Sequence, residues 1–342
     1  MITGAQLAAA FHRDVVQPLL PYAYAAARLG SGSDVLGYDD AMSRDHDWGC
    51  RLTVLVDESS SAVIPQIRRI LAEHLPSEYA GHPVRFPVTW DRTDTHNVEV
   101  ATVHGFAASR LGTRPPLDAL DWLTVSGQGV LEVVGGPVFH DETTELGPLR
   151  AALRWYPPDV DRYTIASLWS QIAQRLHMVG RTAERGQDLQ SRLLCAQIAG
   201  KLSHLAFLVH RQWMPYAKWR EARLRTLPDA DRLCGLLTAA VTANPWQARE
   251  QAIAEAAEML LDVQRARGLP GPEHAIGGFF NRPFRTVNES VVRLLMAEVI
   301  DERLHKLPGV GGVDQWIDAD EVLSNPSLRA SAAVAYRAWS DA

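Results

Sequence analysis

The sequence predicts an α+β protein: a mixed sheet with helices over residues 1–143, followed by an α-helical bundle over residues 144–342. Three observations favour this organisation. Short runs of alternating apolar residues, typical of strands, occur in the first part of the chain. From about residue 145 onward, apolar residues recur at spacings of three, four and seven, as in helices that share a core. Finally, 342 residues are too many for one compact core of ordinary size, so two domains are the default expectation.

Helices and strands alternate in the first predicted domain. Leu7, Phe11 and Val15 recur at helical spacing, whereas valines alternate with other residues after Asn97. On such grounds we expect helices over residues 4–20, 64–74 and 117–123, and strands over residues 22–29, 52–56, 84–90, 97–103 and 130–134. Residues 135–136 are interpreted as a turn, and residues 138–141 as a surface turn.

Long helices dominate the second predicted domain. We expect them over residues 163–179, 189–213, 229–242, 246–267, 288–305 and 319–339. Their leucine, tryptophan and methionine stripes are interpreted as core packing rather than as a cofactor site.

Composition narrows the class of protein. Hydrophobic residues make up 46% and charged residues 22% of the chain, which is ordinary for a globular protein. The net charge of −6 gives no overall basic field, so nucleic acid is a possible partner only through a local basic groove. No apolar run reaches the length of a membrane span, and no membrane partner is expected. Because Cys50, Cys195 and Cys234 have no metal-binding spacing and cannot all pair, a reducing cytoplasm is the expected location.

A stretch near the N-terminus carries the chemistry. Gly32 and Ser33 are followed, after eleven residues, by two carboxylates at alternate positions, Asp45 and Asp47, and then by the apolar run 52–56. In a strand, Asp45 and Asp47 would point to the same face, where two like charges need a neutralising cation. Carboxylate oxygens suit Mg²⁺, and a glycine–serine turn can bring backbone N–H groups close to a phosphate.

These residues resemble a motif of the nucleotidyltransferase superfamily of the DNA polymerase β type. That motif has Gly-Ser or Gly-Gly, about a dozen residues, Asp-x-Asp or Asp-x-Glu on a strand, and a third carboxylate between hydrophobic residues on a later strand. The matching positions here are Gly32, Ser33, Asp45, Asp47 and Glu99, the last between Val98 and Val100. The resemblance implies the fold and the metal site of that superfamily. It is closest to an uncharacterised branch, a domain-of-unknown-function group, for which no substrate is implied.

One position departs from the superfamily pattern. The residue before Gly32 is Ser31, where the pattern has an apolar residue. Gly30 and Ser31, preceded by Leu29, therefore offer a second register with a somewhat longer spacer.

Two clusters in the second predicted domain are candidate nucleotide contacts. Arg181 and Arg185 lie four residues apart, so on a helix they would share a face, and arginine suits phosphate recognition. A solvated corner between helices is an equally good interpretation of that cluster. Tyr216 and Lys218 follow Pro215, where a long helix ends. This resembles antibiotic nucleotidyltransferases, in which a lysine near the start of the next helix contacts the triphosphate; Tyr216 would pack on a base or sugar.

Together these resemblances imply a Mg²⁺-dependent nucleotidyltransferase. The phosphates of an NTP, with ATP favoured, would lie over Gly32 and Ser33. Asp45 and Asp47 would hold one or two Mg²⁺ ions, and Glu99 would complete the second metal site or accept the proton of the acceptor hydroxyl. The favoured acceptor is a hydroxyl-bearing small molecule, and pyrophosphate would be released. Two alternatives stay open: transfer to tRNA or protein, as in toxin-like members, and a non-catalytic nucleotide-binding module.

Overall fold

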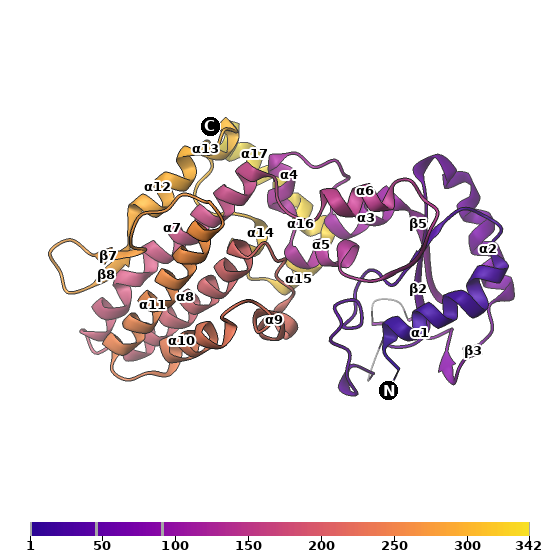
Figure 1. Cartoon of the computed structure of the whole chain (residues 1–342), viewed down its shortest axis with the longest axis horizontal. Helices are drawn as coiled ribbons and strands as arrows, with labels where there is room; N and C mark the ends of the chain where they lie inside the picture. The colour runs from indigo at the N-terminus through magenta and orange to yellow at the C-terminus, as the bar shows by residue number, and fades with distance from the viewer. Residues whose placement is uncertain (1, 45–46, 90–91, 342) are drawn as a thin grey trace. The chain divides into compact units, whose positions relative to one another are not determined.

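The structure is a computed structural model of the whole chain and describes residues 2–44, 47–89 and 92–341 (Figure 1). The chain forms two compact units. The first contains residues 1–116 and 128–154, and the second contains residues 117–127 and 155–342. The predicted domain boundary between residues 143 and 144 stays a prediction, because compact packing does not test independent folding.

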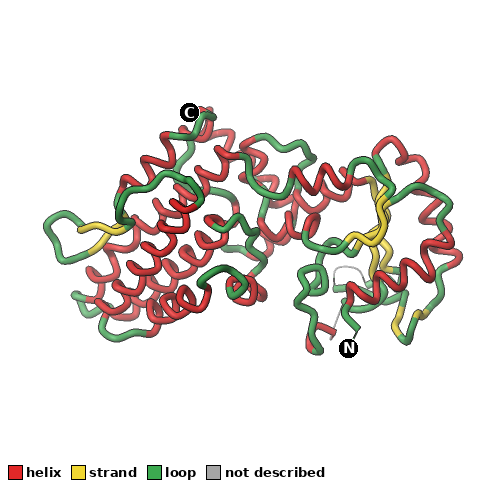
Figure 2. Tube along the Cα trace, in the orientation of Figure 1, coloured by secondary structure: helices red, strands yellow, loops and turns green. Residues whose placement is uncertain are grey.

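A mixed sheet in the first unit and a predominance of helices in the second confirm the predicted α+β composition (Figure 2). The sheet has the strand order β5-β2-β1-β6, in which β1 is antiparallel to β2 and β6, and β2 is parallel to β5. Its strands are β1 (Ala25–Ala27), β2 (Arg51–Val56), β5 (Asn97–Thr102) and β6 (Val138–Asp141). A separate small ribbon pairs β3 (Glu78–Tyr79) with β4 (His82–Pro83).

The two faces of this sheet have different chemistry. On β2 and β5, alternate residues such as Leu52, Val54 and Val98 enter a buried core that also contains Leu7 and Ile67 from the flanking helices. Those helices are α1 (Gly4–Phe11) and α2 (Ile64–His74). The opposite face carries Arg51, Thr53 and Glu99, and Thr53 and Glu99 are partners in the parallel register. Alternation therefore separates an apolar face from a face that presents charged groups.

Further helices of the first unit are α3 (Val103–Leu111), α5 (Gly127–Val134) and α6 (Leu146–Ala152). One of them, α5, occupies a segment for which the sequence predicted a strand. The strand expected over residues 130–134 is wrong, because this segment is part of α5. Gln128 donates to Glu132 one turn later, and Val130, Leu131 and Val133 are buried, so a helix both satisfies its backbone and covers its apolar side chains.

Two expectations about strands also need correction. Residues 138–141 form edge strand β6, not a surface turn, because they pair with β1. Conversely, no strand extends over residues 84–89 within the described part of the chain. Arg85 makes an isolated bridge with His96, and Pro87 has no N–H to continue a ladder. Trp90, the last residue of that expectation, lies outside the described residues.

Helix packing defines the second unit. Its longest helices are α7 (Pro158–Ala183), α8 (Asp188–Val209) and α11 (Trp246–Ala266), which pack on one another. The other helices are α4 (Ala119–Thr124), α9 (Ala217–Leu224), α10 (Ala230–Thr242), α12 (Glu289–Ala297), α13 (Glu302–Lys306), α14 (Val313–Trp316), α15 (Asp320–Ser324), α16 (Pro326–Ser331) and α17 (Ala333–Asp341). A hairpin joins β7 (Ile276–Gly278) to β8 (Arg285–Val287).

One helix passes a test of length and composition for membrane spans. In the described residues this is α8, but 67% of its most apolar stretch is buried against the rest of the structure. A core helix of a bundle has the same properties, so the helix carries no inference about location.

Candidate functional site

The loop that follows β1, residues 28–37, is here called the glycine–serine loop. Gly30 has a φ of +83° and Gly32 a φ of +137°, in the left-handed half of conformational space that glycine adopts readily. The N–H of Gly30 donates to the carbonyl of Glu132 at 2.8 Å, which fixes the start of the loop to α5. The sequence thus places glycine at the positions where the backbone turns most sharply.

A buried ion pair between Arg28 and Asp34 holds this loop in place. Arg28 is only 2% exposed, and its guanidinium donates to both carboxylate oxygens of Asp34, at 2.6 Å from Nε and 2.9 Å from Nη2. The same side chain donates to the carbonyls of Leu29 and Ser31, at 2.6 and 2.8 Å. Because bidentate charge-assisted bonds are strong and directional, the pair holds the loop in one shape. A Cβ on Gly32 would lie 2.3 Å from Asp34 Oδ1, so only glycine fits above the pair.

A second guanidinium, that of Arg51, borders the loop from the sheet. Arg51 opens β2, its Nη2 donates to the Ser31 hydroxyl at 3.4 Å, and its Nη1 donates to the Asp47 carbonyl at 3.3 Å. Burial, together with the nearby charge of Arg28, lowers the pKa of Arg51 to about 9, against the opposing effect of neighbouring carboxylates. The guanidinium therefore stays charged at neutral pH.

A third guanidinium, that of Arg110 on α3, lies beside Gly30. Its Nη2 donates to Glu99 Oε2 at 2.5 Å, and its Nε lies 3.6 Å from Glu132 Oε2. A Cβ on Gly30 would be 3.4 Å from Arg110 Nη2, so this side chain packs directly on the loop. Sequence reasoning missed all three arginines. One available signal was Arg28 itself, a charged residue directly after an apolar strand.

Of the two carboxylates expected on the strand, the structure describes one. Asp45 lies outside the described residues. Asp47 lies in a bend with a φ of +53°, and β2 begins only at Arg51, so the expected strand position of Asp47 is wrong. Its carboxylate accepts from the N–H and the hydroxyl of Thr89, both at 2.7 Å. Aspartate tolerates the left-handed region better than most residues, and these two bonds fix the carboxylate next to the start of β2.

Glu99 lies on β5, within the strand expected there. Its side chain is exposed on the charged face of the sheet and bonds to Arg110. No group of three or more His, Cys, Asp or Glu residues gathers closely enough to hold a metal ion within the described ranges. Asp47 and Glu99 thus do not make a magnesium site with other described residues, and the fit of the predicted trio depends on Asp45.

The remaining candidates belong to the second unit. Lys218 is the second residue of α9, as expected for a lysine near a helix start, and its Nζ lies 5.1 Å from the centre of the Trp219 ring. Tyr216 precedes this helix and is 42% exposed. Arg185 follows α7 on the surface and donates through Nη1 to the carbonyl of Arg181 at 2.5 Å.

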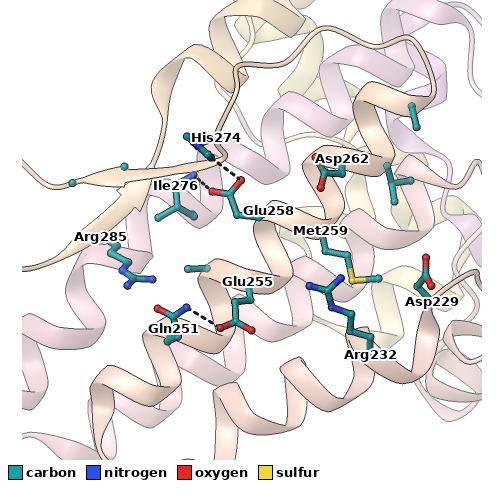
Figure 3. Close-up of a pocket in the computed structure, with 15 residues that line it drawn as sticks. Asp229, Arg232, Gln251, Glu255, Glu258, Met259, Asp262, His274, Ile276 and Arg285 are labelled. Atoms are coloured by element: carbon teal, nitrogen blue, oxygen red, sulfur yellow. Dashed lines mark hydrogen bonds and ion pairs between the residues drawn. The ribbon is translucent and has the colours of Figure 1, made fainter.

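A pocket of about 820 Å³ also lies in the second unit (Figure 3). It is bordered by α11, by the start of α10 and by the β7–β8 hairpin, and none of the predicted site residues lines it. Glu258 on α11 accepts from the N–H groups of Ala275 and Ile276, and Gln251 donates to Glu255. The lining thus mixes fixed carboxylates with the basic side chains of Arg232 and Arg285.

Comparisons with known proteins give two similarities. Residues 122–220, less than a third of the chain, match a family described as Domain of unknown function (DUF4037). The matched residues lie C-terminal to Gly32 and Ser33, on which the resemblance to the nucleotidyltransferase superfamily rests. A solved structure of a nucleotidyltransferase-like protein from Exiguobacterium sibiricum 255-15 is similar over 76% of each chain, with 14% identity and a TM-score of 0.36, which carries no argument about function. No curated protein matches the chain.

Proposed function

We propose that this chain is a nucleotidyltransferase that binds the triphosphate of an NTP, ATP being favoured, at its glycine–serine loop. The nucleoside monophosphate would pass to a hydroxyl of a small-molecule acceptor, with release of pyrophosphate. The observation that supports the proposal best is the loop itself: two left-handed glycines, bordered by the guanidiniums of Arg28, Arg51 and Arg110. Glycine permits close approach of an anion, and guanidinium groups match phosphate oxygens in shape and charge.

Magnesium belongs to the proposal on the grounds of the sequence motif. When bound, Mg²⁺ supplies charge neutralisation for a triphosphate and its leaving group. Asp45 and Asp47 are the proposed ligands, with Glu99 as a third ligand or as the base for the acceptor hydroxyl. Nucleotide contacts by Lys218, Tyr216 and Arg185 remain part of the proposal as the sequence predicts them.

The protein's own groups have separate tasks in this proposal. The Arg28–Asp34 pair fixes the shape of the loop, because Arg28 also holds the Leu29 and Ser31 carbonyls. Thr89 holds the Asp47 carboxylate through two hydrogen bonds, which orients it without a bound ligand. Preorganisation of this kind lowers the free-energy cost of binding and orientation.

A second candidate is a nucleotide-binding module without catalysis. The ion pair between Glu99 and Arg110 favours it, since one carboxylate oxygen of Glu99 already accepts from a guanidinium, which makes the carboxylate a weaker base.

Pyrophosphate release distinguishes these candidates. The purified protein is incubated with each NTP, Mg²⁺ and a panel of hydroxyl-bearing acceptors, and Asp45→Asn and Asp47→Asn serve as matched variants. The side-chain amide of the Asp47→Asn variant can still accept from the Thr89 N–H and contact its hydroxyl, so the fold is expected to persist while turnover is lost. Turnover near that of the unchanged protein in either variant contradicts the proposed site. If the unchanged protein binds an NTP but releases no pyrophosphate with any acceptor, the result supports the non-catalytic nucleotide-binding module.

A further inference from the structure

We propose that the pocket of the second unit binds a linear polyamine, a small organic cation with ammonium groups spaced along an alkyl chain. The pocket lies between α11, the start of α10 and the β7–β8 hairpin, and its volume of about 820 Å³ is in the range of small-ligand sites (Figure 3). Its lining residues are separate from those assigned to nucleotide and metal binding, so the inference does not rest on the proposed function.

Carboxylates along α11 form one side of this pocket. Glu255, Glu258 and Asp262 line it and are three and four residues apart. They therefore share one face of the helix at intervals of about one turn, roughly 5 Å along its axis. A linear polyamine carries its ammonium groups at a comparable interval, one after each short alkyl segment. Successive ammonium groups can thus pair with successive carboxylates.

Two of these carboxylates are held in position by neutral donors of the protein. Glu258 accepts from the backbone N–H groups of Ala275 and Ile276, at 2.9 and 3.0 Å. Glu255 accepts from the side-chain amide of Gln251 at 2.8 Å. Carboxylate oxygens have further lone pairs, so both groups can also accept from a ligand. Because they are already oriented, less side-chain freedom is lost when a ligand binds.

Negative charge predominates in the lining. Its charged groups are the four carboxylates of Asp229, Glu255, Glu258 and Asp262 and the two guanidiniums of Arg232 and Arg285.

The neighbouring bases leave this balance in favour of a cation. Nε of Arg285 lies 3.9 Å from Glu250, a buried carboxylate outside the lining, which partly offsets the charge of Arg285. His274, 3.9 Å from Glu258, adds positive charge only when it is protonated. Arg265 lies 3.8 Å from Asp262, in an exposed contact of the kind that contributes little stability and that a ligand ammonium can replace.

Apolar side chains distinguish an organic cation from a metal ion as the ligand. Met259, Val263 and Ile276 line the pocket beside the carboxylates, where they can pack against the alkyl segments of a polyamine. Across the described residues, no three His, Cys, Asp or Glu side chains come close enough together to hold a metal ion. Acidic and apolar groups thus alternate in the pocket as charged and apolar segments alternate in the ligand.

Calorimetric titration of the full-length protein with spermidine, at low salt, at pH 8 and without NTP or Mg²⁺, tests the inference. The unchanged protein is expected to bind saturably. Glu255→Gln keeps the shape of the side chain and its bond from Gln251, and is expected to bind about 10-fold more weakly because a charge-assisted hydrogen bond is lost. Arg232→Gln removes a positive charge from the lining and is expected to bind about 3-fold more tightly. Glu321→Gln on α15, which removes an exposed carboxylate outside the pocket, is the matched control and should bind as the unchanged protein does.

Two results would overturn the inference: no binding of spermidine by the unchanged protein, or an affinity of Glu255→Gln no lower than that of Glu321→Gln. The second result would mean that spermidine is attracted only by the overall negative charge of the chain. If Glu255→Gln does not fold, Arg232→Gln decides, because binding no tighter than that of the unchanged protein contradicts the site. Pyrophosphate release from NTP is measured separately, so failure of this inference leaves the proposed function standing.

Discussion

Gly32 decides whether the glycine–serine loop can pass over the Arg28–Asp34 ion pair. A Cβ there would lie 2.3 Å from Asp34 Oδ1 and 2.6 Å from Arg28 Nη2, both atoms of a buried pair that cannot swing away freely. Its φ of +137° is also unfavourable for any residue with a side chain. Both effects act at this single residue.

We therefore expect Gly32→Ala to lower the free energy of unfolding of the first unit by roughly 3 kcal/mol, as strain and a disturbed buried pair combine. Gly37→Ala is the matched control: it has a φ of +75° in the same loop, but nothing lies within 4 Å of its Cβ position. It should cost only about 1 kcal/mol, the steric cost of the left-handed region. Urea denaturation measures both, and equal losses would show that the ion pair does not support the loop.

His12 gives the first unit a pH dependence. Its imidazole is buried, Nε2 lies 2.9 Å from the Tyr24 hydroxyl, and burial, with the charge of His140 nearby, lowers its pKa from 6.5 to about 4. The neutral form is therefore favoured in the folded state. As pH falls below 6.5, the unfolded chain binds a proton that the folded chain does not, so stability is lost between about pH 6.5 and pH 4.

At pH 5 this linkage is expected to remove about 2 kcal/mol of the stability present at about pH 7.5. His12→Gln can keep a hydrogen bond to Tyr24 but does not titrate, so its loss over the same interval should be smaller by that amount. Unfolding free energies at the two pH values are compared for both proteins. The same pH dependence in the variant would exclude His12 as the cause.

Residue types predicted part of the site but not its electrostatics. Gly32, Ser33 and Glu99 lie where a loop and a strand were expected, because glycine–serine pairs and valine alternation are local signals. The bend at Asp47 was not predictable in this way, since it depends on Thr89, a residue 42 positions away. Arg51 and Arg110 were missed for the same reason: their contacts with the loop and the sheet come from tertiary packing.

At the scale of elements, α3 links the sheet to the loop. Thr102 ends β5 and caps α3, with its hydroxyl accepting from the N–H of Gly105 at 3.0 Å. Near the other end of this helix, Arg110 bonds to Glu99 and packs on Gly30. The cap therefore helps to hold a guanidinium at the candidate site.

Thr102→Val should lower stability by about 1 kcal/mol, the usual cost of losing a helix N-cap. Thr102→Ser keeps the hydroxyl and should retain most of that stability. Thermal unfolding of the two variants measures the difference. If serine were no better than valine, the hydroxyl would not be the stabilising group.

Some elements with strong periodicity were predictable, and short apolar runs were not. The helices expected over residues 288–305 and 319–339 are wrong as single helices, because α12 and α13 divide the first and α15, α16 and α17 divide the second. The helix expected over residues 64–74 coincides with α2, and the strand expected over 97–103 contains β5 and ends one residue beyond it. Residues 130–134 are helical because a short run of valine and leucine fits either structure, and burial of Val130, Leu131 and Val133 within α5 decides it. Strand β6 exists through its pairing with β1, which no local pattern shows.

At the scale of the whole molecule, the chain passes between its two units three times. Residues 128–154 return to the first unit, where α6 buries Leu146 and Leu149. A cut after residue 143 removes this helix, whereas a cut after residue 154 keeps it. The fragment 1–154 is therefore expected to melt more cooperatively and at a higher temperature than the fragment 1–143. Identical melting of the two would favour the boundary predicted at residues 143 and 144.

The central claim is that the glycine–serine loop binds the triphosphate of a nucleotide, and calorimetric titration with each NTP tests it most directly. The unchanged protein is titrated with and without Mg²⁺, beside Gly32→Ala and the control Gly37→Ala. The account predicts saturable binding of at least one NTP, lost in Gly32→Ala and kept in Gly37→Ala. Binding that survives unchanged in a folded Gly32→Ala protein, or no binding of any NTP by the unchanged protein, would contradict it.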